Sequence, residues 1–157
     1  MTDMEKVKIH GVPETMMQTL FARAAHSQKK EHKFYDAKAI EIVKQLDYDF
    51  SKAEKDAAMS SGVIARTILL DQMVGAFLEE HPDATVVNIA CGLDTRVYRL
   101  DNGQVRWYNL DLPEVIDIRR RFLNEHGRIS MIAKSAMDES WAAEIEDPTG
   151  EVLVVIE

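Results

Sequence analysis

The stretch that decides the fold is Thr85-Val86-Val87-Asn88-Ile89-Ala90-Cys91-Gly92-Leu93-Asp94-Thr95-Arg96. A β-branched apolar run ends in small residues and then turns polar, which is the pattern of a buried strand that leads into a tight loop. A second run, Val105-Arg106-Trp107-Tyr108-Asn109-Leu110, follows and ends in Asp111. In nucleotide-binding α/β units the small residues let the backbone approach a ligand, and an acid at the second strand tip accepts the ribose hydroxyls. We therefore predict the first half of such a unit around this loop.

The chain ahead of Thr85 has the spacing of helices. Apolar residues recur at helical intervals over roughly residues 13–29, and Asp36 can cap a second helix. A long amphipathic helix is expected from Ser60 or Ser61 to about Glu80, where Pro82 stops it. Its predicted buried face consists of Ile64, Ile68, Leu69, Met73, Phe77 and Leu78.

We therefore expect an all-helical cap over residues 1–83 and the first part of a cofactor-binding domain over residues 84–157.

The chain after Asp111 continues the alternation of helices and strands. Pro113 is expected to start a helix through His126, and residues 129–133 read as a third strand. A helix is expected over residues 138–145. The β-branched run at residues 151–157 is typical of a strand buried on both faces. This pattern predicts an α/β fold with about four parallel strands.

The apolar last strand has a further implication. Such a strand is unusual as an exposed edge, because unpaired backbone groups invite pairing with another chain. We therefore expect that the chain is the truncated front part of a longer protein, with a missing C-terminal segment over this strand. The alternative is that another copy covers the strand in a homo-oligomer.

Composition narrows the classes of function. A net charge of −8 argues against non-specific nucleic-acid binding, which depends on Lys and Arg. No apolar run approaches the ~20 residues of a membrane span, and the five histidines lack metal-ligand spacing. The single cysteine, Cys91, fits a reducing compartment. We predict a cytoplasmic protein that binds no metal, nucleic acid or membrane.

Two segments carry a resemblance to a known family. The Gly-Leu-Asp-Thr-Arg segment at residues 92–96 and the Asp-Leu-Pro-Glu-Val segment at residues 111–115 resemble the leucine carboxyl methyltransferase family. The chain looks closest to the polyketide-type O-methyltransferase branch. The resemblance implies a Rossmann-like class I methyltransferase sheet that binds S-adenosylmethionine. It also implies methylation of a carboxylate or hydroxyl oxygen of a small-molecule substrate.

The resemblance assigns cofactor contacts to particular positions. Arg66 matches an arginine that binds the cofactor's carboxylate, although by composition alone a solvated helix arginine is the simpler interpretation. Asp111 is expected to hold the ribose, and the family usually has glycine where this chain has Ala90. The full set of implied cofactor contacts is Arg23, Arg66, Ala90, Gly92, Asp111, Ser135, Ala136, Asp138 and Glu157.

Several roles stay open at this point. Asp138 can contact adenine or cap a helix, and Asp94 and Thr95 can order the loop or cap the helix that follows. The sequence names no catalytic base, and Cys91 reads as a small packed residue. One rival function is an NAD-type dinucleotide-binding oxidoreductase. The loop argues against it, because it lacks the third glycine of the dinucleotide fingerprint. The other rival is a truncated, non-catalytic homologue.

Overall fold

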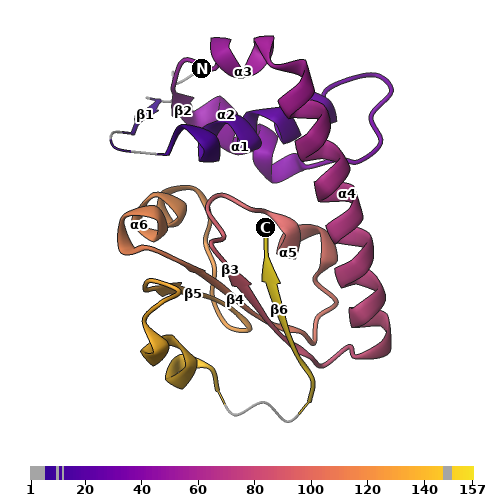
Figure 1. The fold of residues 1–157 in the computed structure, drawn as a ribbon, viewed down its shortest axis with the longest axis vertical. Helices are drawn as coiled ribbons and strands as arrows, with labels where there is room; N and C mark the ends of the chain where they lie inside the picture. The colour runs from indigo at the N-terminus through magenta and orange to yellow at the C-terminus, as the bar shows by residue number, and fades with distance from the viewer. Residues whose placement is uncertain (1–5, 10, 12, 147–149) are drawn as a thin grey trace, which may run out of the picture. The chain divides into compact units, whose positions relative to one another are not determined.

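The computed structural model describes residues 6–9, 11, 13–146 and 150–157 (Figure 1). The chain forms two compact units, residues 1–72 and 73–157, and the division falls within the long helix α4 (Ala57–Glu80). The expected boundary lay further on, between residues 83 and 84. The C-terminal part of α4 belongs with the second unit because Val74 and Leu78 pack into the core of that unit.

The first unit is largely but not wholly helical. Two short strands, β1 and β2, pair in parallel with Val7 opposite Leu46, so the expectation of an all-helical segment is wrong. The chain becomes extended at Leu46, which is buried, and this exposes backbone groups for pairing. Two-residue strands carry too little periodicity to be seen in a sequence. The elements are β1 (Val7–Lys8), α1 (Glu14–Ser27), α2 (Ala37–Gln45), β2 (Leu46–Asp47), α3 (Ser51–Lys55) and the start of α4.

A buried ion pair joins α1 to the start of α2. Arg23 Nε donates to Asp36 Oδ2 over 3.1 Å, and the two side chains are 7% and 1% exposed. The other oxygen, Asp36 Oδ1, accepts from the backbone N–H of Ala39 at 2.9 Å, which confirms Asp36 as the cap of α2. Ser27 extends the cluster, because its hydroxyl donates to the carbonyl of Arg23 and accepts from the backbone N–H of Asp36.

The ring of His26, on the same helix, is hydrogen-bonded to the segment between α1 and α2. Its Nε2 accepts a hydrogen bond from the backbone N–H of Lys33 at 2.9 Å, which requires a neutral ring. Burial, and then the positive charges of Lys29, His32 and Lys33, lower the pKa of His26 from 6.5. The unfolded chain therefore binds a proton at His26 more readily than the folded chain does.

The stability of the chain is expected to fall at acid pH because of His26. The contribution of neutral His26 is present above its unfolded pKa of 6.5 and is lost as pH falls through the lower folded pKa. Imidazole NMR titration should give a pKa for His26 below 6.5. Urea unfolding should show that His26→Gln reduces the stability difference between about pH 7.5 and about pH 5.5. A measured pKa of 6.5 or above for His26 contradicts this account.

The second unit is a parallel sheet with helices. Its strand order is β5-β4-β3-β6, and all three pairings are parallel, as the sequence predicts. The α/β expectation is therefore confirmed. The strands are β3 (Thr85–Ile89), β4 (Arg106–Asp111), β5 (Ile129–Ala133) and β6 (Val152–Ile156).

The connections of the second unit are shorter than expected. α5 (Arg96–Leu100) joins β3 to β4, and α6 (Pro113–Phe122) follows β4. The expected helix to His126 ends early because the buried Leu123 adopts an extended conformation. The helix expected over residues 138–145 is a short 3₁₀ helix, Glu139–Glu144.

Side chains cover the two faces of the sheet differently. Trp107, Val86 and Val97 lie in one core with α4 residues Val74 and Leu78. On the other face, Tyr108, Leu110 and Ile132 pack with Trp141 and Ile145. Apolar side chains therefore pack on both faces of the sheet, in which β3 lies between β4 and β6. This packing holds the end of β3, where the loop begins, in place.

The strand β6 differs from its prediction. It lies at the edge of the sheet, where Val155 is buried but Val152, Val154 and Ile156 are 45%, 48% and 68% exposed. The expectation of burial on both faces is wrong because alternate residues of a strand point to opposite faces, and here one face is exposed. The exposed side chains form an apolar row along an unpaired edge.

The helix α4 also departs from expectation. Leu69 and Met73, which were expected on its buried face, are 56% and 60% exposed, whereas Val63 and Thr67 are buried.

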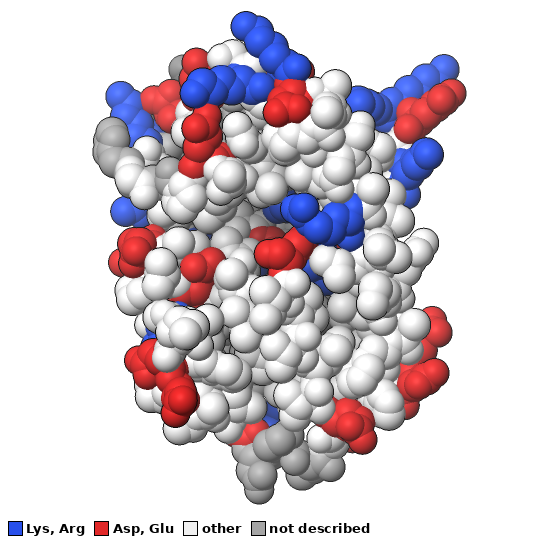
Figure 2. Space-filling view, viewed as in Figure 1, with Lys and Arg blue, Asp and Glu red and all other residues white. Residues whose placement is uncertain are grey.

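By length and composition alone, α4 could cross a membrane, with a mean hydropathy of 1.3. One such helix is weak evidence, because core helices of soluble proteins have the same length and composition. Acidic and basic side chains are interspersed on the face shown in Figure 2.

Candidate nucleotide-binding site

The carboxyl ends of the four parallel strands lie along one edge of the second unit. The loop after β3 begins at Ala90, β4 ends at Asp111, Ser135 follows β5, and Glu157 follows β6. Figure 1 shows β6 ending at the C-terminus on the same side as the end of β3. Ligands of open parallel sheets bind at this edge. The fold thus gathers four of the predicted positions.

Asp111 is joined directly to the predicted loop. Its Oδ2 accepts from the backbone N–H of Gly92 at 2.8 Å, and its Oδ1 accepts from the N–H of Leu112 at 2.7 Å. A carboxylate offers about four lone-pair sites, so each oxygen keeps one for a ligand hydroxyl. Asp111 is half-buried.

The loop has a left-handed backbone at two positions. Gly92 has φ of 49°, and among the described residues Ala90 is the one non-glycine residue with positive φ, at 55°. A side chain at such a position crowds the following carbonyl, whereas glycine adopts the conformation freely. The family's usual glycine at this position therefore suits the observed backbone better than the alanine does.

The substitution Ala90→Gly is expected to stabilise the second unit. Glycine removes about 1–2 kcal/mol of backbone strain from the folded state. It also raises the conformational entropy of the unfolded chain, which costs about 0.4–1 kcal/mol of stability. The free energy of unfolding should therefore rise by about 0.5–1 kcal/mol. Urea unfolding measures this change. Ala142→Gly is the control, because Ala142 is exposed and has an ordinary φ. A loss of stability in both variants would contradict the strain at Ala90.

A row of buried amides lies beneath the loop. Asn88 and Asn109 are opposite each other on β3 and β4, and Asn88 Nδ2 donates to Asn109 Oδ1 at 3.1 Å. Asn109 Oδ1 also accepts from Trp107 Nε1 at 2.9 Å. Asn88 Nδ2 donates in addition to Asp94 Oδ2 at 2.9 Å. The loop is thereby tied to the two central strands through side chains.

Arg96 links the loop to the tip of β6. Its guanidinium is 1% exposed and lies 3.3 Å from Asp94 Oδ2 and 3.1 Å from Glu157 Oε2. Asp94 therefore orders the loop, which was one of its two open roles. Thr95 makes no side-chain cap to α5, and its hydroxyl accepts from Arg99 at 3.0 Å. Arg96 thus joins the Glu157 carboxylate to Asp94 of the loop, and contact of Glu157 with a cofactor stays a prediction.

The segment after β5 is arranged by local hydrogen bonds. Ser135 Oγ accepts from the backbone N–H of Met137, and Asp138 Oδ1 caps the 3₁₀ helix through the N–H of Ser140 at 3.0 Å. Hydrogen bonds from the side chain and then from the backbone of Ser140 lower the pKa of Asp138. The carbonyl of Ala136 accepts from Trp141 Nε1. The capping role of Asp138 is observed, and contact of this segment with adenine stays a prediction.

Two predicted contacts belong to the first unit. Arg23 is buried against Asp36, as described above, and Arg66 is an exposed residue of α4. Their roles toward a cofactor stay predictions. Cys91, next to the loop glycine, is 4% exposed, and burial raises the pKa of its thiol to about 12. A neutral, buried thiol is a packed residue and a poor nucleophile.

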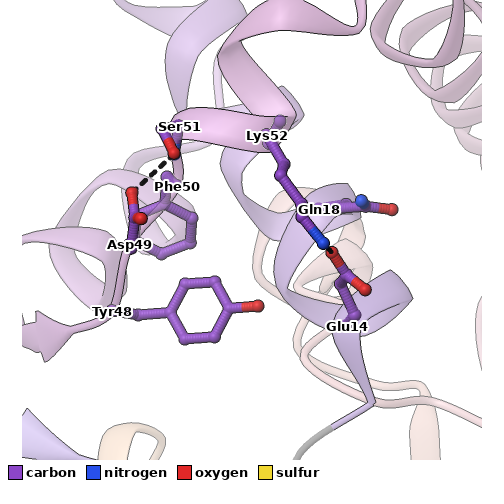
Figure 3. A pocket seen from close by; sticks show the side chains of 8 residues that line it. Glu14, Gln18, Tyr48, Asp49, Phe50, Ser51 and Lys52 are labelled. Atoms are coloured by element: carbon purple, nitrogen blue, oxygen red, sulfur yellow. Dashed lines mark hydrogen bonds and ion pairs between the residues drawn. The ribbon is translucent and has the colours of Figure 1, made fainter.

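The described residues contain no group of three or more His, Cys, Asp or Glu side chains placed to hold a metal. A separate pocket of about 410 Å³ lies in the first unit (Figure 3). Lys52 and Glu14 form an ion pair of 3.2 Å beside it, and Asp49 accepts from the backbone N–H of Ser51. None of the predicted cofactor residues lines this pocket.

Sequence reasoning missed four residues that build the site. Asn88 and Asn109 are polar residues in otherwise apolar strands at matching register, which was a visible signal. Arg119 lies on the apolar stripe of α6, where a charge is unexpected. Arg119 donates to the loop carbonyls of Gly92 and Asp94 and pairs with Glu125 at 2.8 Å. Glu125 gave no signal, because it was expected to lie within that helix.

The fold is mixed α/β, and a loop of small residues follows β3 at the carboxyl edge of its parallel sheet. The chain belongs to the leucine carboxyl methyltransferase family, whose sequence profile matches residues 16–150. The resemblance stated from the two motifs is thereby confirmed.

Two relatives are similar over most of the chain. One, from Streptomyces glaucescens, is a tetracenomycin polyketide synthesis O-methyltransferase, 38% identical over 87% of this chain and 51% of its own length. The other, an S-adenosyl-L-methionine-dependent methyltransferase from Gibberella zeae, is 31% identical over 98% of this chain and 56% of its own length. The chain thus spans about half the length of these relatives.

Proposed function

We propose that the protein is an S-adenosylmethionine-dependent O-methyltransferase that acts on a carboxylate or hydroxyl group of a small molecule. Family membership and the names of both relatives support this proposal. The observation that carries it is the hydrogen bond between Asp111 and Gly92, because it joins an acid at a strand tip to a loop of small residues. This combination suits a ribose and the atoms attached to it.

We propose that residues at the carboxyl edge of the sheet hold this cofactor. In the proposed Rossmann-like class I arrangement, Asp111 accepts the ribose hydroxyls and the backbone of Ala90 and Gly92 lies against the cofactor. Ser135, Ala136 and Asp138 are proposed to border the adenine, and Glu157 to border the same pocket from β6. Arg66 is proposed to bind the cofactor's carboxylate and Arg23 to lie near its methionine end.

The chemistry places few demands on the protein. S-adenosylmethionine supplies an electrophilic methyl group with a good neutral leaving group. The protein's task is to hold donor and acceptor at near-attack distance and to exclude water. A carboxylate acceptor is ionised at neutral pH and requires no general base, whereas an alcohol or phenol requires one. A carboxylate acceptor therefore requires fewer protein groups than an alcohol or phenol acceptor does.

Thermal unfolding with two ligands tests this proposal against the oxidoreductase alternative. Binding to the folded state raises the melting temperature. S-adenosylhomocysteine, the product form of the cofactor, is expected to raise it, and NAD⁺ at the same concentration is not. Stabilisation by NAD⁺ alone would favour an oxidoreductase.

The exposed row on β6 supports a second proposal. Val152, Val154 and Ile156 present apolar side chains along an unpaired edge, which natural sheets usually protect. We propose that β6 is covered by further polypeptide, either from a longer protein or from a second copy. Light scattering before and after Val154→Lys distinguishes these, because only a dimer should dissociate. If the 157 residues transfer no methyl group while a longer parent does, the chain alone is a non-catalytic fragment.

A further inference from the structure

Three consecutive arginines lie in the last turn of α6, and they have different environments. Arg120 is 55% exposed, and Arg121 is exposed as well, whereas the side chain of Arg119 is 0% exposed. Arg119 lies on the buried side of the helix with Val115 and Ile116. Long charged side chains are almost never fully buried unless they are paired. The contacts of Arg119 therefore need an explanation beyond helix packing.

Arg119 bonds directly to the loop after β3. Its Nη1 donates to the carbonyl of Asp94 at 2.6 Å and to the carbonyl of Gly92 at 3.1 Å. The N–H of Gly92 is already held by Asp111. The glycine is therefore fixed on both sides, through its N–H by one side chain and through its carbonyl by another.

The other side of the guanidinium is anchored to the sheet. Arg119 Nε donates to Glu125 Oε1 at 2.9 Å, and the side chain of Glu125 is also 0% exposed. Glu125 Oε1 accepts in turn from Asn109 Nδ2 at 2.6 Å. Asn109 belongs to β4 and bonds to Asn88 and Trp107. An unbroken series of hydrogen bonds thus connects the sheet to the loop through Arg119.

We propose that Arg119, held by Glu125 and Asn109, is a positioning residue that sets the conformation of residues 90–95 and thereby the affinity for the cofactor's nucleoside. This inference rests on the proposed function. A guanidinium is suited to this role because its planar fork donates in fixed directions to the carboxylate and to the loop carbonyls. The single ammonium of a lysine cannot reproduce that geometry.

Two variants test the proposal. Arg119→Lys keeps the charge opposite Glu125, and the double variant Arg119→Met with Glu125→Gln removes both buried charges together, which guards against failure to fold. The amide oxygen introduced by Glu125→Gln keeps an acceptor for Asn109. Arg120→Lys is the matched control, because Arg120 is the exposed neighbour. Each protein is measured by amide hydrogen exchange and by calorimetric titration with S-adenosylhomocysteine.

Loss of charge-assisted bonds should speed exchange at the amides of residues 90–95 by about tenfold or more, with the β3 and β4 amides unchanged. The dissociation constant for S-adenosylhomocysteine should rise by about tenfold or more. Arg120→Lys should change neither quantity.

Unchanged loop exchange, or equal acceleration across the whole sheet, would overturn the positioning role. Faster loop exchange with unaltered affinity would overturn the link to the cofactor. If the unmodified chain fails to bind S-adenosylhomocysteine, the proposed function fails in this chain. The exchange measurement still decides whether Arg119 sets the loop conformation.

Discussion

Replacing Asp111 with alanine is expected to weaken the binding of S-adenosylhomocysteine by about 100-fold or more. Two hydrogen bonds from ribose hydroxyls to a carboxylate contribute about 1.5–3 kcal/mol each, and each 1.4 kcal/mol is a factor of about ten in affinity. The variant also releases the N–H of Gly92, which Asp111 holds at 2.8 Å. Isothermal titration calorimetry measures the change.

The control for Asp111→Ala is Asp117→Ala. The side chain of Asp117 is 70% exposed on α6, so this variant loses the same charge without touching the loop. The control should bind S-adenosylhomocysteine as the unmodified chain does. An Asp111→Ala protein that is folded and binds with unaltered affinity would contradict the assignment of the ribose to Asp111.

Replacing Asp36 with alanine is expected to lower the free energy of unfolding by about 3–5 kcal/mol, the usual cost of breaking a buried ion pair. The change leaves Arg23 buried at 7% exposure without the Asp36 carboxylate and removes the cap of α2. Urea unfolding followed by circular dichroism measures the loss, since the first unit is largely helical.

Two comparisons give this experiment its meaning. Arg23→Met combined with Asp36→Asn removes both charges and keeps a side-chain acceptor for the α2 cap, so it should cost clearly less than Asp36→Ala. Glu31→Ala, at an exposed residue between α1 and α2, removes one acidic side chain away from the ion pair and should cost little. Equal losses in Asp36→Ala and in the double variant would show that the buried ion pair does not account for the effect.

The central part of the fold could be predicted because its signals are local. The β-branched run at residues 85–89, the small residues after it and Asp111 lie close together in the sequence, and parallel pairing brings their ends to one edge. The capping role of Asp36 could be anticipated for the same reason, because a cap needs only the next few residues.

The remainder depends on tertiary contacts that no local pattern records. The exposure of β6 follows from its place in the strand order, which residues 151–157 do not encode. Glu125 reaches Arg119 only because α6 ends at Phe122, ahead of the expected end. The left-handed backbone of Ala90 contradicts the ordinary preference of alanine, so propensity alone could not predict it.

The most direct test of the central claim is NMR mapping of S-adenosylhomocysteine on the isotope-labelled chain. The account predicts that the backbone amides of residues 90–94, of Asp111 and Leu112, and of residues 133–136 shift on titration, since these lie at the carboxyl edge of the sheet. Shifts confined to the pocket beside Glu14 and Lys52, or no shifts in a folded chain, would contradict it.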